Sequence, residues 1–146
     1  GDDRRQRQMC IRDRIYLNHF RMEYSPYESG LDRFIHPNKG NFIGLDALNK
    51  WREKGFNNKL VTLEVHNVSD ADVLGNNPIY ENGTCIGRAT GGDFGFRLGK
   101  SIALGMVKPE LANVGQKLKI DILGKTHEAT ILEESPYDPK NELLRA

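Results

Sequence analysis

The chain has 146 residues, of which 38% are hydrophobic and 28% are charged, and its formal net charge is +1. A chain of this length forms one domain, or one domain with part of another, and it can bury a core without metals or disulfides. The near-neutral charge argues against a dedicated nucleic-acid binder, and the lack of a long apolar run argues against a membrane span.

The cysteine content predicts a reducing compartment. The two cysteines, Cys10 and Cys85, have no CxxC spacing and are too few for a disulfide framework. The first residues also lack the apolar stretch of a secretory signal. We therefore expect a cytoplasmic protein, or a mitochondrial matrix protein if the source is eukaryotic.

Residues 1–14 differ in composition from the rest of the chain. They contain five arginines and three aspartates, with Met9, Cys10 and Ile11 as the clearly apolar side chains. Such a segment is expected to be disordered. A basic arm for nucleic acid or anionic lipid is one interpretation; a transit peptide fits less well, because serine is absent. The run MCIRDR also resembles a translated sequencing-adapter scar, which predicts that this tail is not native.

Residues 15–56 are predicted to contain one helix. In the stretch Leu45–Lys54, apolar residues recur at helical spacing, and Gly55 stands where a helix C-cap is expected. Residues 24–27 are expected to be extended or to form a turn, because Pro26 disfavours a helical residue before it. Residues 37–41 are typical of a tight turn.

From Lys59 onward the apolar pattern changes to a period of two, which indicates strands. The turn Glu81-Asn82-Gly83 lies between two of these segments, and Asn-Gly is a strong hairpin signal. The pattern predicts a mainly β fold, a small closed antiparallel β-barrel preceded by a short α-containing fragment; a sandwich has a similar signature. The expected strand segments are 61–66, 78–80, 84–86, 101–106, 117–122 and 129–131.

Several motifs resemble catalytic or binding sites but are better explained by ordinary roles in turns, loop capping and packing. Gly99-Lys100-Ser101 lacks the earlier glycine of a phosphate-binding loop, and a strand pattern follows it where that loop needs a helix. Asp70 and Asp72 could hold a cation, but capping of a loop is the commoner use. Cys85, in a strand after a hairpin, is expected to be a small buried residue. The histidines have no metal-ligand spacing and are His19, His36, His66 and His127.

Glu28 is the most promising functional residue. It lies in a predicted turn between aromatic residues. A carboxylate can accept two hydrogen bonds from the edge of an aminopyrimidine ring, while Tyr24 or Tyr27 stacks on the ring face. The alternative is an ordinary acidic residue in a turn.

The order of several motifs resembles the C-terminal part of the glycine-cleavage T-protein (aminomethyltransferase) family. These motifs are YSPYESGLDRF (24–34), NFIGLDAL (41–48), KLVTLE (59–64), GTCIGRATG (83–91) and LGKSIAL (98–104). Two further stretches are similar to the folate module of dimethylglycine and sarcosine dehydrogenases: DADVLGNNPI (70–79) and PYDPKNELLRA (136–146).

The resemblance implies a division of the chain and a cofactor. Residues 15–56 would end a folate-binding domain, and residues 57–146 would form its C-terminal barrel, which closes the folate site. The parent would carry tetrahydrofolate, and FAD in an upstream domain, and would act on a small N-methyl amine. Its upstream folate and flavin domains would be the partners of this chain, without nucleic acid or membrane.

The resemblance carries over one functional residue, Glu28, as the carboxylate that holds the pterin edge. No catalytic residue and no metal ligand are carried over, so this chain alone is expected to be inactive. An arginine that many family members place before the KLV strand is absent, because Asn57 and Asn58 stand there.

The sequence leaves three functions open. The first is the C-terminal folate-module fragment of a flavin-linked, tetrahydrofolate-dependent demethylating dehydrogenase. The second is the equivalent part of an aminomethyltransferase, and the third is a stand-alone, non-catalytic barrel that binds a protein. If the chain is a fragment, an exposed apolar patch is expected around Phe34, Phe42, Ile43 and Trp51.

Overall fold

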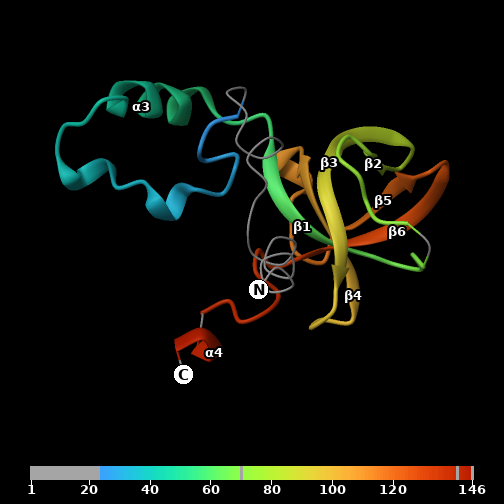
Figure 1. The fold of residues 1–146 in the computed structure, drawn as a ribbon. Coiled ribbons are helices and arrows are strands. Elements are labelled where there is room, and N and C mark those ends of the chain that lie inside the picture. The colour runs from blue at the N-terminus through green and yellow to red at the C-terminus, as the bar shows by residue number, and fades with distance from the viewer. Residues whose placement is uncertain (1–23, 70, 141, 146) are drawn as a thin grey trace.

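In the computed structural model, the predicted strands form a closed barrel. The structure describes residues 24–69, 71–140 and 142–145, and within them six strands pair in the order β1-β4-β3-β2-β5-β6, with β6 returning to β1 (Figure 1). Every pairing is antiparallel. The predicted fold class is therefore confirmed. The strands are β1 Lys59–Val65, β2 Pro78–Glu81, β3 Thr84–Gly95, β4 Lys100–Val107, β5 Lys117–Ile122 and β6 Lys125–Leu132.

Two-residue turns with left-handed backbone join neighbouring strands. Asn82 and Gly83 have φ values of 49° and 79°, as a type I′ hairpin turn between β2 and β3 requires. Leu123 and Gly124, at 48° and 79°, make the same kind of turn between β5 and β6. The predicted Asn-Gly hairpin is thus confirmed.

Alternating side chains of all six strands fill the barrel. On β4 the inward residues are small: a Cβ atom added at Gly105 would lie 2.7 Å from Cδ1 of Ile79. The larger Ile102 and Met106 point to the outer face of β4 and are still buried. The core residues on the strands are Val61, Leu63, Val65, Ile79, Ile86, Ala89, Ala103, Val107, Leu118, Ile120, Ile122, Ala129 and Ile131.

A loosely packed lobe, residues 31–57, precedes the barrel and projects to one side of it (Figure 1). The predicted helix is confirmed as α3, Leu45–Lys54, with Gly55 following at φ 80°. No side chain of the lobe is buried. Of the residues in the expected apolar patch, Ile43 is fully exposed, Phe34 is 66% and Trp51 39% exposed, and Phe42 is half-buried. The lobe also contains the 3-10 helices η1 Asp32–Phe34 and η2 Pro37–Lys39.

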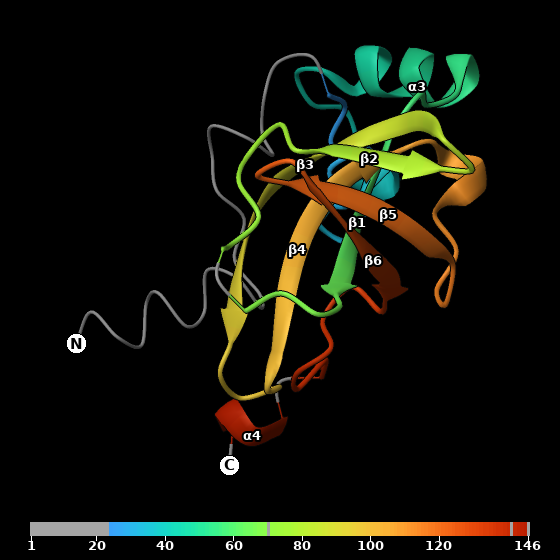
Figure 2. The same ribbon diagram turned by 90° about the vertical axis from the view of Figure 1, so that its right-hand side faces the viewer.

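Two short helices follow within the second half of the chain. The 3-10 helix η3, Pro109–Leu111, connects β4 to β5, and α4, Glu142–Arg145, lies below the β3–β4 end of the barrel (Figure 2). No helix among the described residues is long and apolar enough to cross a membrane. The predictions for residues 1–14 and for Asp70 lie outside the described residues.

Candidate functional site

Glu28 lies in a single helical turn that Ser25 begins. The backbone N–H and the hydroxyl of Ser25 both donate to Oε2 of Glu28, each at 2.9 Å. In return the Glu28 N–H donates to the Ser25 hydroxyl at 3.2 Å. This reciprocal pairing of a serine with a glutamate three residues later is the geometry of a capping box. It fixes the direction of the carboxylate.

The other carboxylate oxygen of Glu28 binds the end of the lobe that leads into β1. The place where the two ends of the lobe meet is its neck. Oε1 accepts the backbone N–H groups of Asn57 at 3.2 Å and Asn58 at 3.0 Å, and the Asn58 amide at 3.5 Å. The Glu28 carbonyl also accepts the Leu60 N–H at 2.8 Å, at the start of β1. The two ends of the lobe therefore meet at this one residue.

These contacts keep the Glu28 carboxylate ionised. Burial acts to raise the pKa of Glu28, but the hydrogen bonds from Ser25, Asn58 and Asn57 outweigh it and hold the pKa below its usual value. Glu28 is only 8% exposed. The site thus presents a nearly buried anion held by donors on both oxygens.

The same turn, residues 24–28, crosses the outer face of the barrel and is bonded to strands β1 and β3, and it is called the strapped turn below. Leu60 of β1, Met106 of β4 and Arg88 of β3 form one cross-strand row. Glu28 is bonded to one end of this row at Leu60, and Arg88 donates to the Tyr24 hydroxyl at 2.6 Å at the other end. Met106, between them, is 1% exposed. The barrel thereby holds the turn in a defined position.

Tyr27 contributes a buried hydroxyl that has no hydrogen-bond partner among the described residues. Its ring lies against the Phe56 ring, with 5.4 Å between the ring centroids. Leaving a buried donor unpaired costs about 1–3 kcal/mol. Such a group in a native structure calls for an explanation.

The remaining predicted candidates lie apart from this turn. Gly99 has a φ of 65° in the β3–β4 turn and Lys100 donates to Glu64 at 2.8 Å, so this segment is a hairpin, with no phosphate-binding loop. Asp72 is exposed in the loop after β1. Within the described ranges no three His, Cys, Asp or Glu residues are grouped to hold a metal ion.

The prediction that Cys85 is buried is wrong. Cys85 is exposed: it pairs with Tyr80 near the turn end of the β2–β3 hairpin, and a register shift beside this pair leaves the inward position to its neighbour Ile86. Its thiol lies 3.5 Å from the Gly87 carbonyl. Such an irregularity interrupts the inward and outward alternation of a strand, so the local pattern alone could not assign Cys85 to a face.

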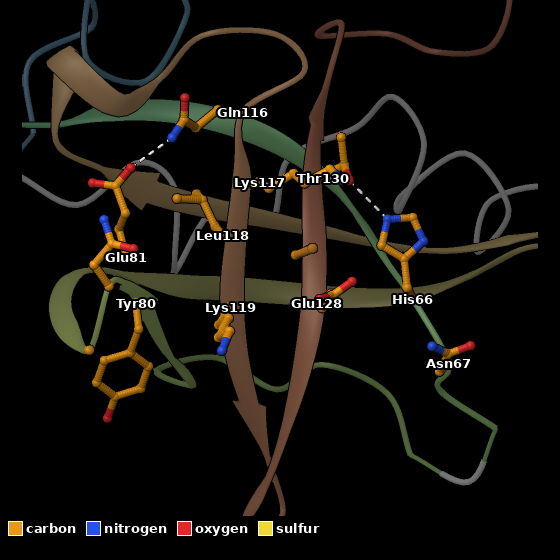
Figure 3. Close-up of a pocket in the computed structure, with 13 residues that line it drawn as sticks. His66, Asn67, Tyr80, Glu81, Gln116, Lys117, Leu118, Lys119, Glu128 and Thr130 are labelled. Atoms are coloured by element: carbon orange, nitrogen blue, oxygen red, sulfur yellow. Dashed lines mark hydrogen bonds between the residues drawn. The ribbon is translucent and has the colours of Figure 1, made fainter.

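A second candidate site is a polar groove of about 580 Å³ on the outer face of β2, β5 and β6, which the sequence reasoning missed (Figure 3). Gln116 donates to Glu81 at 2.7 Å, and His66 lies 2.9 Å from the Thr130 hydroxyl. The strand order puts the groove on the opposite side of the barrel from the Glu28 turn. Its lining residues are His66, Asn67, Tyr80, Glu81, Asn82, Gly83, Gln116, Lys117, Leu118, Lys119, Glu128, Ala129 and Thr130.

Sequence reasoning singled out Glu28 as a candidate but did not predict most of its surroundings. The Ser25-x-x-Glu28 spacing is a local signal for a capping box and could have been recognised. The donors at Asn57 and Asn58 come from 29 and 30 residues away, and no local pattern predicts them. The groove likewise requires the strand order, which single-strand periodicity does not supply.

The fold and the strapped turn together define a barrel domain that carries a folded-back N-terminal segment. The family model described as "Glycine cleavage T-protein C-terminal barrel domain" matches residues 58–138. The chain belongs to this family.

Relatives of two kinds share this domain. The chain is 36% identical to rat mitochondrial dimethylglycine dehydrogenase over 122 residues, which are 83% of this chain and 14% of that protein. It is 38% identical to an aminomethyltransferase of Desulfitobacterium hafniense over 123 residues, which are 84% of this chain and 33% of that protein. The chain therefore spans only a minor part of each relative.

A solved structure shows the same fold. The aminomethyltransferase T of the glycine cleavage system from Bartonella henselae superposes with a TM-score of 0.66 at 21% identity, over 75% of this chain and 31% of that one. The match in fold agrees with the family assignment.

Proposed function

We propose that this chain is the C-terminal part of the folate module of a flavin-linked, tetrahydrofolate-dependent demethylating dehydrogenase that acts on an N-methyl amine such as dimethylglycine or sarcosine. Support comes from the family membership and from the similarity to dimethylglycine dehydrogenases over 83% of the chain. In this proposal FAD and the first part of the folate body belong to the upstream chain. Residues 15–56 would end the folate-binding domain, and residues 57–146 would be the barrel.

The alternative is the corresponding part of an aminomethyltransferase. The similarity to the Desulfitobacterium hafniense aminomethyltransferase, at 38% identity, favours it as strongly. Both alternatives use a folate module, so they share a folate site at Glu28 and differ in what stands upstream.

The strapped turn is the observation that carries the folate proposal. Glu28 offers a nearly buried, ionised carboxylate whose Oε2 is held firmly by Ser25 at 2.9 Å. Its Oε1 receives three longer bonds, of 3.0 to 3.5 Å, from Asn57 and Asn58. The edge of an aminopyrimidine ring presents two N–H donors to a carboxylate, so it could replace two of these three bonds.

This arrangement assigns separate roles to the barrel and to the carboxylate. Glu28 would orient the pterin edge, and Tyr24 or Tyr27 would lie against the ring. The barrel would hold the turn through Leu60 and Arg88 and would help to exclude water from a reactive one-carbon unit. Bound tetrahydrofolate supplies the acceptor for that unit, and no described residue is proposed to move a proton.

Sequencing of the genomic DNA upstream of codon 15 tests the proposal. A continuous reading frame that encodes a strand–GxGxxG–helix unit, and a purified product that carries flavin, are the results expected for the dehydrogenase. A frame that encodes only the rest of a folate body would favour the aminomethyltransferase. A stop codon with a genuine start directly after it would refute both and leave a small protein-binding barrel.

A further inference from the structure

We propose that the polar groove on β2, β5 and β6 binds a free amino dicarboxylic acid of the glutamate type. Lys117 and Lys119 of β5 would hold its two carboxylates, and Glu128 of β6 would hold its ammonium group. The inference goes beyond the proposed folate function and does not depend on it, because the groove and the strapped turn lie on opposite sides of the barrel.

Strand pairing brings the three charges together on one surface. Lys119 stands directly opposite Glu128, and Lys117 stands two positions earlier on the same strand. Residues two apart share a face of a strand, so both lysines are on the outer face, while Leu118 between them belongs to the core. All three charged side chains line the groove of about 580 Å³.

The three charges have no partners within the described part of the chain. Opposite charges at facing positions of two strands can stabilise a sheet by contacting each other. Yet neither Lys119 nor Glu128 takes part in an ion pair among the described residues, and the same is true of Lys117. In Figure 3 the Glu128 carboxylate extends toward the His66 side of the groove, and the Lys119 side chain does not point toward it. These head groups are therefore available to a ligand.

The polar groups at the two sides of the groove, in contrast, are already paired. Gln116 donates to Glu81 at 2.7 Å on one side, and His66 lies 2.9 Å from the Thr130 hydroxyl on the other. Glu81 is thus occupied, and the lysine and carboxylate charges left in the groove are two positive and one negative. A ligand with two carboxylates and one ammonium group complements this set.

The spacing of the lysines suits two carboxylates. Residues two apart along a strand are separated by about 7 Å, so each lysine can bind a carboxylate of its own. Glu128 accepts hydrogen bonds only, and the ligand's ammonium group supplies donors for it. A dicarboxylate without the ammonium group would bring like charges beside Glu128. The groove should therefore prefer glutamate to glutarate, which has the same two carboxylates and no ammonium group.

Titration of the isotope-labelled chain with L-glutamate, followed by the NMR shifts of its backbone amides, tests the proposal. We expect binding in the millimolar range, because exposed ion pairs are weak, with the shifts concentrated in β5 and β6 at the groove. Lys119→Gln should weaken the binding about fivefold, as for one exposed ion pair. Lys108→Gln is the matched control, because Lys108 is exposed and lies outside the groove.

Glu128→Gln gives the result that a merely structural role would not produce. Glutamate should bind this variant about fivefold more weakly and glutarate more tightly, so that the preference between them disappears. A variant with a damaged fold would lose both ligands, and its amide spectrum would show the damage. The proposal is wrong if glutamate causes no shifts at the groove, if the wild type binds glutarate as well as glutamate, or if Lys108→Gln weakens binding as much as Lys119→Gln.

Discussion

Removal of the Glu28 carboxylate is expected to destabilise the chain through its hydrogen bonds. In Glu28→Gln, the carboxamide keeps one acceptor oxygen and turns an NH₂ group toward one of the two donor sets, at Ser25 or at Asn57 and Asn58. Buried donors without acceptors cost about 1–3 kcal/mol, so we expect a loss of about 1.5 kcal/mol. Glu28→Ala removes the acceptor of both donor sets and should lower the free energy of unfolding by about 3 kcal/mol.

Urea unfolding followed by far-ultraviolet circular dichroism at pH 7 measures these losses. Glu133→Gln is the matched control, because Glu133 is exposed and a neutral surface change there should stay within about 0.5 kcal/mol of the wild type. A stability of Glu28→Ala within that same range would show that the carboxylate does not hold the turn and the neck of the lobe together.

The pH dependence of the same difference gives an independent check. The pKa of Glu28 is lowered from its ordinary value of 4.5 in the folded chain. A carboxyl with a depressed folded pKa stabilises above its unfolded pKa, and this contribution is lost as the pH falls through the folded pKa. The difference in free energy of unfolding between the wild type and Glu28→Gln should therefore be full at pH 7 and shrink below about pH 4.5. A gap of constant size down to pH 3 would contradict the ionised, hydrogen-bonded carboxylate.

Three further predictions concern the barrel and the lobe. Gly105→Ala should destabilise the chain by about 1–3 kcal/mol in urea unfolding, because the new Cβ would lie 2.7 Å from Cδ1 of Ile79; an unchanged midpoint would show that the core has room. Ile43→Ser should lower the binding of a hydrophobic dye with little change in stability, because Ile43 is fully exposed; a large stability loss would mean that Ile43 is packed in solution. Glu28→Ala should speed tryptic cleavage within α3, at Lys50, because the neck of the lobe opens; equal cleavage of wild type and variant would show that Glu28 does not close the neck.

Much of the barrel could be predicted because its signals are local. Alternation along a strand and the Asn82-Gly83 turn each depend on a few neighbouring residues, and so does the helix Leu45–Lys54 with Gly55 after it. The structure reproduces these features. The pattern did not say which face of a strand points inward, and this is why the exposed position of Cys85 was predicted wrongly.

The β4 strand shows the limit of a hydrophobicity pattern most clearly. Its large apolar residues Ile102 and Met106 face outward, and the small Ala103 and Gly105 face the barrel interior. Side chains from the other strands already fill that interior, so a small closed barrel needs small residues on one strand. Met106, which is 1% exposed, lies between the two strand positions that are bonded to the turn from Tyr24 to Glu28, and one of these bonds, from Arg88 to Tyr24, joins residues 64 apart.

The lobe and the barrel depend on different kinds of contact, and Glu28 connects them. The barrel is closed by strand pairing and a continuous core, whereas no side chain of residues 31–57 is buried. Without a core of its own, the lobe is held at its neck by the bonds from Asn57 and Asn58 to Glu28 and by the Tyr27–Phe56 ring contact. These are the contacts that a ligand at Glu28 would exchange. Ligand binding and the packing of the lobe are therefore expected to be coupled, whereas the barrel, which is bonded to the turn through Leu60 and Arg88, keeps the site in place.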